Sequence, residues 1–337
     1  MKYLITGGAG FIGSHLAERL LEHGNSVVIL DNFYRNGSRT TALWLKSLFT
    51  NRLEIIEADV SRDMNVINDC VSKCDAVFHF AAQVAVTGSV IDPRLDFETN
   101  ILGTFNVLEA IRAKSSATPL FFSSTNKVYG SLSAETMEET DYRYVWPMRR
   151  NGISESQSLD LYSPYGCSKG SADQYVLDYA RIYGLATVVF RQSCIYGPRQ
   201  FGIEDQGWLA WFAIAGSRGI PITLYGSGKQ VRDVLFVSDL LDLFELALAK
   251  IDRIRGNVYN VGGGSQNTLS LLESIPIIEK ALSKRIRVEH GEIRPGDQYI
   301  YVSDISRVKM DLGWLPTVGI SEGIRIMTEW ISRNFAT

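Results

Sequence analysis

The chain has few of the residues that mark disulfide-rich or metal-binding proteins. It contains four cysteines and four histidines among 337 residues. The cysteines form no CxxC pair, and no histidine cluster accompanies them. We therefore predict reduced thiols and no bound metal. The four positions are Cys70, Cys74, Cys167 and Cys194.

Long apolar runs and a strong charge of one sign are also lacking. No run is long enough to cross a bilayer, and the first one, Tyr3 to Ile5, is read as a strand and not as a secretory signal. The net charge of −3 offers no basic excess for nucleic acid. With 45% apolar and 21% charged residues, the composition is that of a globular protein. We predict a cytoplasmic location, with neither a membrane nor a nucleic acid as partner.

Glycines, in contrast, gather where the first strand should end. Tyr3 to Ile5 leads into Gly7, Gly10 and Gly13, and leucines at helical spacing follow. A strand, a tight turn and a helix N-terminus form a phosphate site, because glycine lets the backbone approach and the free N–H groups attract negative charge. Three glycines can also form a merely structural turn. The residues predicted to hold a dinucleotide here are Gly7, Gly10, Phe11, Ile12 and Gly13.

The next strand, 26–30, supports the dinucleotide interpretation. It ends in Asp31, which lies 18 residues after Gly13, close to the ~20 expected for an acid that binds the ribose hydroxyls. The charge of Asp31 would repel a 2′-phosphate, so NAD is favoured over NADP. Arg35 keeps NADP open. Asn32 is assigned to the same cofactor site.

Strands and helices alternate from residue 3 to residue 190. Further strands are predicted at 53–58, 75–80, 119–124 and 186–190. This alternation predicts an α/β fold with a doubly wound parallel Rossmann sheet, whose ligands lie at the carboxyl ends of the strands. We predict an NAD-binding domain over 1–193 and a smaller substrate-binding lobe over 194–337. The lobe is expected to contain helices at 238–250 and 270–282 and a strand at 286–289.

Polar and small residues follow the other strands. Asp59 either reaches the adenine amino group or caps the next helix. Ala81 and Ala82 are small enough to let a strand end pass beneath the cofactor, and His79 is predicted to be a packed core residue. A long helix is expected over 96–114. The cofactor set therefore also includes Asp59, Val60, Ala81, Ala82, Asn100 and Ser123.

Tyr165 and Lys169 are four positions apart, and so share one face of a helix. A phenol has a pKa near 10, and an adjacent ammonium is expected to lower that pKa. Tyr165 can then take a proton from a sugar hydroxyl, while Lys169 holds the nicotinamide ribose. Thr125, at the end of the fifth strand, would orient the substrate oxygen. An exposed helical pair is the alternative interpretation of Tyr165 and Lys169 taken alone.

With these motifs in view, the chain resembles the extended short-chain dehydrogenase/reductases, specifically the nucleotide-sugar epimerases and dehydratases. The resemblance covers essentially the whole chain. It implies an enzyme that binds NAD and a nucleotide-diphosphate sugar, the sugar nucleotide being held by the smaller lobe. The motifs are Thr6-Gly-Gly-Ala-Gly-Phe-Ile-Gly13, the serine-rich end of the fifth strand, Tyr165-x-x-x-Lys169, Tyr196-Gly-Pro-Arg199, Val231-Arg-Asp-Val234 and Arg294-Pro-Gly-Asp297.

The residues after Thr125 indicate the branch of that family. Dehydratases carry two carboxyl residues, Asp-Glu, at this place, and this chain has Asn126 and Lys127 instead. Dehydration is therefore disfavoured, and Asp31 argues against reductases that use NADPH. Epimerisation remains, in which a hydride leaves the sugar and returns to its other face.

The segment from Ser123 to Gly130 resembles that of the CDP-tyvelose (CDP-paratose) 2-epimerases, as do Ser163 to Gly170 and Asp205 to Trp208. The resemblance implies C2 epimerisation of a CDP-hexose by transient oxidation. Gln192 to Ile195 departs from this pattern and is closer to general 4-epimerases. A UDP-sugar 4-epimerase therefore stays as the alternative, and a non-catalytic NAD-binding protein as a third.

Substrate contacts are predicted mainly after residue 194. Arg232 and Arg294 suit the diphosphate, because the guanidinium fork matches phosphate oxygens. Asp297 is assigned to the nucleotide ribose, and Gln206 or Trp208 to the base. Alternatively, Arg232 forms a plain ion pair with Asp233, and Trp208 and Trp211 belong to the core. The predicted substrate set is Gln83, Thr125, Asn126, Gln206, Arg232, Arg294 and Asp297.

Two further expectations concern surfaces. The segment 142–157, which precedes the catalytic helix, either forms a lid over the sugar or only covers the sheet edge. The resemblance implies a homodimer or homotetramer, paired through the helices at 96–114 and 165–183.

Overall fold

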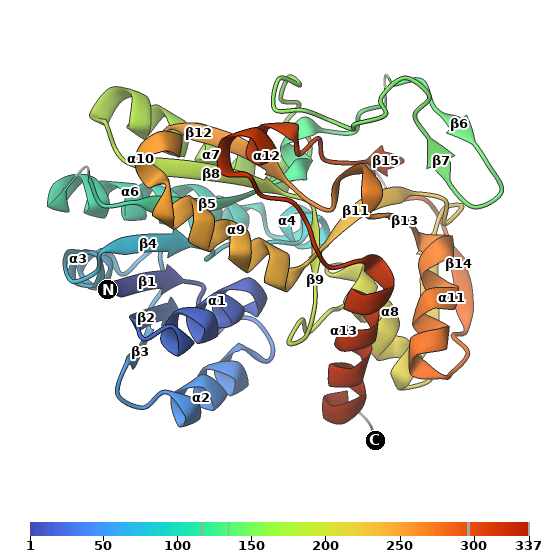
Figure 1. The fold of residues 1–337 in the computed structure, drawn as a ribbon, viewed down its shortest axis with the longest axis horizontal. Coiled ribbons are helices and arrows are strands. Elements are labelled where there is room, and N and C mark those ends of the chain that lie inside the picture. Colours follow the sequence, from blue (N-terminus) through green and yellow to red (C-terminus); the bar gives the residue numbers. More distant parts are fainter. Residues whose placement is uncertain (116, 134, 295–296, 336–337) are drawn as a thin grey trace. The chain divides into compact units, whose positions relative to one another are not determined.

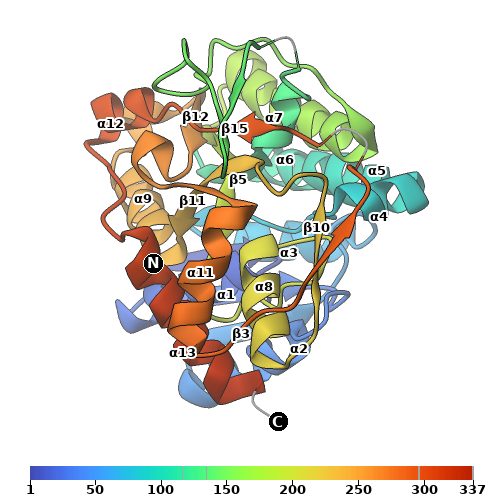
Figure 2. The ribbon, with the colours of Figure 1, turned by 90° about the vertical axis from the view of Figure 1, so that its right-hand side faces the viewer.

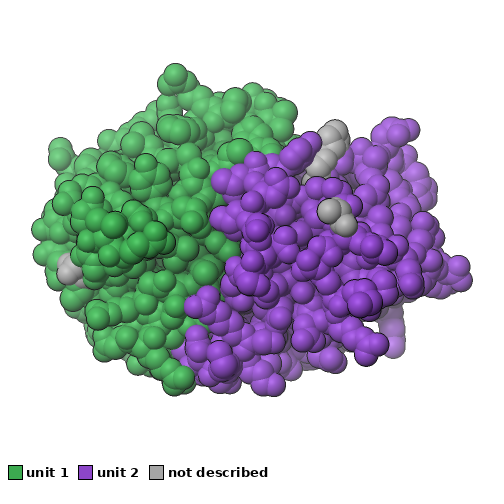
Figure 3. All heavy atoms as spheres, turned by 90° about the horizontal axis from the view of Figure 1, so that it is seen from above, with its two compact units in different colours: residues 1–125, 163–191, 241–259 green, residues 126–162, 192–240, 260–337 purple. Residues whose placement is uncertain are grey.

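The computed structural model describes residues 1–115, 117–133, 135–294 and 297–335. The chain divides into two compact units (Figure 3). The first comprises Met1–Thr125, Ser163–Arg191 and Leu241–Tyr259, and the second comprises Asn126–Tyr162, Gln192–Leu240 and Asn260–Thr337. The chain thus passes between the units several times, whereas the predicted domains meet at one boundary after residue 193. The assignment of ligands to the two parts stays a prediction.

A seven-stranded sheet organises the first unit, with the order β12-β8-β5-β4-β1-β2-β3 (Figure 1). β1 pairs in parallel with both β2 and β4, so the strand order reverses beside β1. That reversal is the switch point at which open α/β sheets bind ligands. The predicted doubly wound Rossmann fold is confirmed. The strands are β1 (Lys2–Thr6), β2 (Ser26–Asp31), β3 (Leu53–Glu57), β4 (Ala76–His79), β5 (Leu120–Thr125), β8 (Thr187–Gln192) and β12 (Asn257–Val261).

The central strands bury both faces, as strands of parallel sheets do. Phe121 of β5 stacks on Phe78 with ring centroids 4.8 Å apart, and Phe78 meets Phe244 at 5.8 Å. The next residue along β5, Phe122, belongs instead to the core beneath the helices of the other face. The alternation of side chains along a strand explains why neighbouring phenylalanines serve two cores.

Helices cover the sheet of the first unit, and two of them differ from the predictions. The helix predicted at 238–250 for the smaller lobe forms as α9, one residue earlier at each end, but from Leu241 onward it belongs to the first unit. The predicted helix at 96–114 consists of a short α-helix, a π-helical turn at Glu98–Leu102, and a longer α-helix. Such turns inside helices are frequent at functional sites. The helices are α1 (Phe11–Glu22), α2 (Ser38–Leu48), α3 (Met64–Ser72), α4 (Val86–Ile91), α5 (Pro93–Phe97), α6 (Gly103–Lys114), α7 (Ser163–Tyr183), α9 (Val237–Ala249) and α10 (Ile251–Ile254).

The second unit combines small sheets with three packed helices (Figure 2). Ser270 caps α11 through a reciprocal bond pair with Glu273, which fixes the predicted start of that helix. The predicted strand at 286–289 forms as β14, two residues later at each end. The elements are β9 (Cys194–Tyr196), β10 (Ile222–Tyr225), β11 (Val231–Phe236), β13 (Thr268–Ser270), β14 (Val288–Gly291), β15 (Ile300–Tyr301), α8 (Trp208–Ser217), α11 (Leu271–Leu282), α12 (Ser306–Leu312) and α13 (Ile320–Phe335).

Residues 142–157 pack within the second unit. Tyr144, in β7 (Tyr144–Val145), which pairs with β6 (Glu138–Glu139), donates its N–H to the Lys229 carbonyl at 3.0 Å. Ile153 is fully buried, and its N–H bonds to the carbonyl of Val302 at 2.8 Å. The segment is therefore anchored to that unit at both of its ends.

Candidate functional site

The glycine turn forms a close-packed cradle at the start of α1. Gly7 has a φ of +66°, and a Cβ added there would lie 2.6 Å from the backbone nitrogen of Ala81. A Cβ on Gly13 would lie 2.5 Å from the Gly7 carbonyl oxygen. The first backbone N–H groups of a helix have no carbonyl partner within that helix. In α1 this first turn begins with Phe11 and Ile12, and it carries no acidic side chain. The cradle can accept an anion there.

Asp31 ends β2 beside this cradle. Its carboxylate accepts the N–H of Ala9 at 3.0 Å and the N–H of Phe33 at 2.9 Å. Burial raises the pKa of the Asp31 carboxyl, and the two N–H donors oppose that shift. The carboxylate is therefore tied to the glycine turn itself, as expected for an acid that positions a ribose next to a pyrophosphate.

Asn32 and Asp59 contact one another across the ends of β2 and β3. The Asn32 amide donates to the Asp59 carboxylate at 2.9 Å, and the Ser61 hydroxyl donates to it at 2.6 Å. Burial acts to raise the pKa of Asp59, but these hydrogen bonds outweigh it and lower the pKa. The residue that precedes α3 is Asp63, so Asp59 is not the helix cap, and its predicted contact with adenine stays a prediction. Val60 is buried and packs under Gly103 of α6.

The residues after β4 are held by Asn100, in the π-helical turn. Its amide donates to the Gln83 carbonyl at 3.1 Å and to the Ser168 hydroxyl at 2.9 Å, and its oxygen accepts the Gln83 N–H at 2.9 Å. Ala81 and Ala82 are half-buried in the same stretch. Asn100 therefore fixes the strand end against α7, and the predicted cofactor contacts of these residues stay predictions.

His79 is a packed core histidine, as predicted. Its side chain is 1% exposed, and its two ring nitrogens lie 2.6 Å from the Thr6 hydroxyl and 3.0 Å from the Thr104 hydroxyl. Burial, with the positive charge of Lys169, lowers the pKa of His79 to about 3. The ring is neutral at physiological pH.

The three predicted catalytic residues come together in the first unit. The Tyr165 hydroxyl is hydrogen-bonded to the Thr125 side chain, and the Tyr165 N–H donates to the Ser89 hydroxyl at 3.1 Å. The Lys169 ammonium donates to the Ser123 carbonyl at 2.6 Å and lies 4.2 Å from the centroid of the Phe122 ring. Tyr165 and Lys169 are buried, which excludes the interpretation of an exposed helical pair.

The pKa of Tyr165 is raised in this structure, whereas the neighbouring Lys169 is expected to lower it. Burial raises the pKa of Tyr165 to about 12; the Thr125 hydrogen bond opposes this rise and the charge of Asp96 adds to it. Burial lowers the pKa of Lys169 to about 7, against the charges of Asp173 and Asp96. Desolvation disfavours the charged form of both groups, so at neutral pH the phenol is protonated and the ammonium is close to its midpoint.

A cluster of charges lies in the second unit. Arg232, on β11, donates to the Asp297 carboxylate at 2.8 Å, and the Lys127 ammonium lies 3.8 Å from the same oxygen. Burial acts to raise the pKa of Asp297, but the charges of Arg232 and Lys127 outweigh it and lower the pKa. Burial and the neighbouring Arg232 lower the pKa of Lys127. Two cations thus share one carboxylate, so the cluster can accept further negative charge.

The alternative of a plain ion pair between Arg232 and Asp233 is wrong. Side chains alternate along β11, so the two residues face opposite sides of the strand. The fully buried carboxylate of Asp233 accepts hydrogen bonds from the Ser193 hydroxyl at 2.5 Å and the Gly264 N–H at 3.1 Å. Arg232 pairs with Asp297 instead.

Arg294 is held at a second place in this unit. Its guanidinium lies 3.0 Å from the Asp205 carboxylate and 3.8 Å from the centroid of the Tyr225 ring. The Tyr225 hydroxyl donates to Glu204 at 2.8 Å. Pro295 and Gly296, the middle of the predicted motif, lie outside the described residues.

The remaining substrate predictions have varied surroundings. The Asn126 amide lies 3.3 Å from the Gln298 side-chain oxygen, and Gln206 exchanges two backbone hydrogen bonds with Ile203. Trp208 donates its ring N–H to the Cys194 sulfur at 3.4 Å. Trp208 and Trp211 both pack against the core of the second unit, as their alternative interpretation expected.

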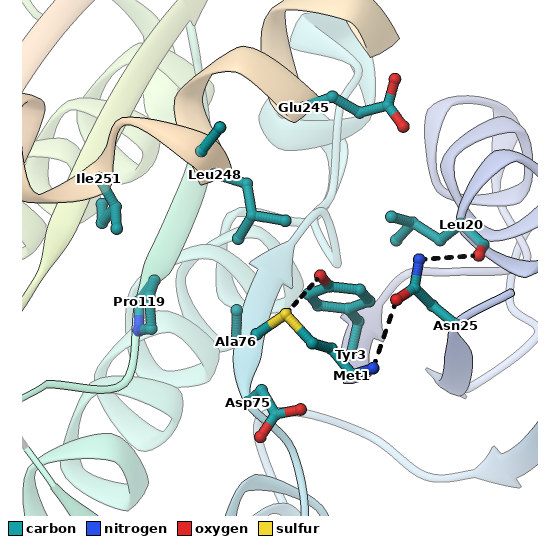
Figure 4. Close-up of a pocket in the computed structure, with 11 residues that line it drawn as sticks. Met1, Tyr3, Leu20, Asn25, Asp75, Ala76, Pro119, Glu245, Leu248 and Ile251 are labelled. Atoms are coloured by element: carbon teal, nitrogen blue, oxygen red, sulfur yellow. Dashed lines mark hydrogen bonds between the residues drawn. The ribbon is translucent and has the colours of Figure 1, made fainter. Parts of the chain in front are cut away.

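The first unit also contains a pocket that is separate from the glycine turn. A pocket with a cavity volume of about 430 Å³ lies at the amino ends of β1 and β4, where Asp75, Ala76 and Glu245 line it (Figure 4). This is the opposite end of the strands from the glycine turn. Within the described ranges no three or more metal-binding side chains gather, and no helix is long and apolar enough to cross a bilayer.

The fold and the first site define a Rossmann-type enzyme with a buried Thr-Tyr-Lys set. Residues 4–327 match the family model described as GDP-mannose 4,6 dehydratase. The chain belongs to this family, which confirms the predicted membership in the extended short-chain dehydrogenase/reductases.

Similar proteins with different named activities share this fold. The CDP-paratose 2-epimerase of Salmonella typhi is 45% identical over 339 residues, which cover 98% of this chain and 99% of that protein. A UDP-glucose 4-epimerase of Thermus thermophilus, crystallised with NAD, is 33% identical with a TM-score of 0.82, covering 98% of this chain and 99% of that chain. A dTDP-glucose 4,6-dehydratase of Streptomyces venezuelae, also with NAD, is 28% identical with a TM-score of 0.86, covering 99% and 98%. The fold alone therefore does not select the reaction.

Sequence reasoning missed several residues that hold the sites together. Asp96, Ser168 and Asp173 surround Lys169, and Lys127 enters the sequence analysis only as a replacement for a carboxyl.

Proposed function

We propose that the chain is an NAD-dependent epimerase that inverts C2 of a CDP-hexose, by transient oxidation to a keto sugar. The observation that carries this proposal is the 45% identity, over nearly the whole length, with a CDP-paratose 2-epimerase. The residues that follow Thr125 support it, because Asn126 and Lys127 cannot supply the paired carboxyl groups of a dehydratase.

The first unit fits NAD. Gly7, Gly10 and Gly13 allow the close backbone packing of this turn, α1 offers its free N–H groups, and Asp31 lies at the end of β2 for the ribose hydroxyls. Asn32 and Asp59, which follow the ends of β2 and β3, are assigned to the adenine side of the cofactor. Bound NAD supplies a hydride acceptor that becomes a hydride donor for the return step.

The catalytic set then handles the proton. Thr125 and Tyr165 together hold the sugar hydroxyl, and Tyr165 receives the hydroxyl proton as the carbon loses its hydride. With a pKa of about 12, the phenol of the chain alone is a poor base, so positive charge beside it is required. Lys169 holds α7 to β5 through the Ser123 carbonyl.

The charged cluster of the second unit suits the diphosphate. Arg232 and Lys127 share Asp297, so their combined charge exceeds that of their partner by one unit. Arg294 has a planar neighbour in Tyr225 and a carboxylate neighbour in Asp205. We assign the diphosphate to Arg232 and Arg294, the nucleotide ribose to Asp297 and the base to Gln206. Cytosine is preferred as the base, because the relative that is 45% identical is a CDP-paratose 2-epimerase.

A homodimer or homotetramer in the cytoplasm completes the proposal. Apolar side chains are exposed on the helices that the resemblance assigns to subunit pairing, and they would be covered in such an assembly. They include Phe105 of α6 and Tyr175, Ile182 and Tyr183 of α7.

Product analysis tests the proposal. The pure protein is incubated with CDP-glucose or with UDP-glucose, without added NAD, and the sugars are released by hydrolysis and separated. Mannose from CDP-glucose is the expected product, and its formation without added NAD means that the cofactor is retained. Galactose from UDP-glucose would instead favour a 4-epimerase, for which a 4-epimerase structure with a TM-score of 0.82 is the supporting observation.

A further inference from the structure

A carboxylate that the proposed reaction does not use lies beside the catalytic helix. Asp96, on α5, is 1% exposed. Its oxygen accepts the Asn100 amide at 3.1 Å, and the Ser168 hydroxyl is hydrogen-bonded to it. Both donors are neutral, and a buried carboxylate with only neutral donors is costly unless a positive charge lies nearby.

Lys169 is the nearby positive charge. Burial lowers the pKa of Lys169 to about 7, and two carboxylates, Asp173 and Asp96, act to raise it. Asp173 already has a partner, because both its oxygens accept hydrogen bonds from the Arg191 guanidinium at 2.9 Å. Much of its charge is therefore compensated locally. Asp96, whose hydrogen-bond donors are both neutral, is the second carboxylate that favours the ammonium of Lys169.

The elements packed against α5 add little other charge. α4 contains no ionisable side chain, and Glu98 in the π-helical turn is paired with Arg94 at 3.1 Å. On the sheet side His79 is neutral, with a pKa of about 3. On α7 the ionisable neighbours are Tyr165, Lys169 and Asp173.

Asp96 is also tied to the backbone of α7. Asn100 donates to the Ser168 hydroxyl at 2.9 Å, and that hydroxyl lies 3.2 Å from the Tyr165 carbonyl. The same Asn100 amide reaches Asp96 and Gln83. One network therefore links α5, the π-helical turn and the first turns of α7.

We propose that Asp96 is a positioning residue of the Tyr165–Lys169 pair: its buried carboxylate, fixed by Asn100 and Ser168, is a counter-charge that, together with Asp173, favours the ammonium of Lys169. Asp96 also acts on Tyr165, whose phenolate it disfavours. The carboxylate thus favours the ammonium of Lys169 and the phenol of Tyr165 in the resting pair, so that the proton acceptor forms only when positive charge reaches the phenol.

The direct test is a titration of Lys169 in the pure full-length protein. Lysine labelled with ¹³C at Cε is followed by NMR from pH 5 to 10, and the Lys169 signal is identified by its loss in Lys169→Arg. In Asp96→Asn the midpoint of Lys169 is expected to fall by about one pH unit, since removal of an opposite charge disfavours the ammonium. The matched control is Asp92→Asn, because Asp92 is an exposed α5 cap and asparagine caps equally well.

A midpoint that is unchanged in Asp96→Asn would overturn the proposal. So would an equal fall in Asp92→Asn. Asp96→Glu restores the charge, and the midpoint should return most of the way toward that of the parent protein. Thermal unfolding of each variant separates this effect from a loss of fold, because a merely structural residue lowers Tm without moving the lysine titration.

Turnover provides the second readout, and this part rests on the proposed function. With CDP-glucose as substrate, the alkaline fall in the plot of kcat against pH should move to lower pH in Asp96→Asn. At pH values above this fall, kcat of Asp96→Asn should be about tenfold below that of the parent protein. A uniform loss at every pH would indicate a structural role only. If CDP-glucose is no substrate at all, the proposed function fails, while the lysine titration still decides the role of Asp96.

Discussion

The sites of the two units are held together by different kinds of interaction. In the first unit, neutral donors and backbone groups hold the functional side chains, as Ala9 and Phe33 hold Asp31. In the second unit, ion pairs hold the functional side chains, as Asp297 holds Arg232.

This difference matches two kinds of ligand. Neutral hydrogen bonds remain in place when a ligand arrives, so the first site is preorganised for a cofactor that stays bound. If the diphosphate binds as proposed, the arginines of the second unit must exchange or share their carboxylate partners. Such exchange lowers the net affinity and suits a substrate that leaves at every turnover.

The largest effect expected from breaking the first site is that of Tyr165→Phe. Removal of the hydroxyl should lower kcat by about a thousandfold, because a positioned acid–base group contributes on that scale. Bound NAD, measured after denaturation, should remain. Tyr175→Phe is the control, since Tyr175 lies on the same helix and is exposed. Normal turnover in Tyr165→Phe would remove the hydroxyl from the mechanism.

The glycine cradle tests whether the first site is preorganised. Gly7→Ala should lower the free energy of unfolding by about 1–3 kcal/mol and release NAD, because φ is +66° and the added Cβ meets Ala81. Gly24→Ala is the control: φ is +84°, but the nearest atom to the added Cβ is 3.7 Å away. Chemical denaturation measures the free energy of unfolding of both variants. Equal losses would mean that backbone strain, and not the close approach to Ala81, sets the cost.

The charged cluster is tested by Arg232→Lys. This change keeps the charge and removes the planar fork, so KM for the sugar nucleotide should rise about tenfold while kcat changes little. Arg285→Lys is the control, because the Arg285 side chain is 92% exposed. A fall in kcat at unchanged KM would contradict the assignment of Arg232 to binding.

The smallest effect at neutral pH is that of His79, which acts only as the pH falls. His79 has a pKa lowered to about 3, below that of an unfolded histidine, so the unfolded chain binds the proton first as the pH falls. Its contribution to stability is complete above pH 6.5 and is lost from there down to about pH 3, at about 1.4 kcal/mol per pH unit. His79→Gln should flatten this decline in urea unfolding, and the exposed His290→Gln should leave it unchanged. An unaltered slope in His79→Gln would show that other groups cause the decline.

Local patterns predicted most of the first unit. The glycine turn, the alternating strands and Tyr165 with Lys169 depend on spacings of a few residues, which can be read directly from the chain. The structure confirms the parallel sheet and the packed His79. The roles of individual residues toward ligands stay predictions.

What the sequence could not supply are contacts between distant residues. Asp173 meets Arg191 from another element, and Arg232 pairs with Asp297 and not with the adjacent Asp233. The expected pKa of Tyr165 failed for the same reason: spacing gives the neighbour Lys169, but burial and the charge of Asp96 decide the shift. Desolvation depends on the whole fold.

The most direct test of the account is the fate of the hydrogen at C2. CDP-glucose that carries deuterium at C2 is incubated with the protein in ordinary water, and the released sugars are analysed by mass spectrometry. The account predicts mannose that retains the deuterium, because the hydride leaves and returns without exchange with solvent. Mannose without deuterium would contradict hydride transfer, and galactose that keeps deuterium at C2 would contradict reaction at that carbon.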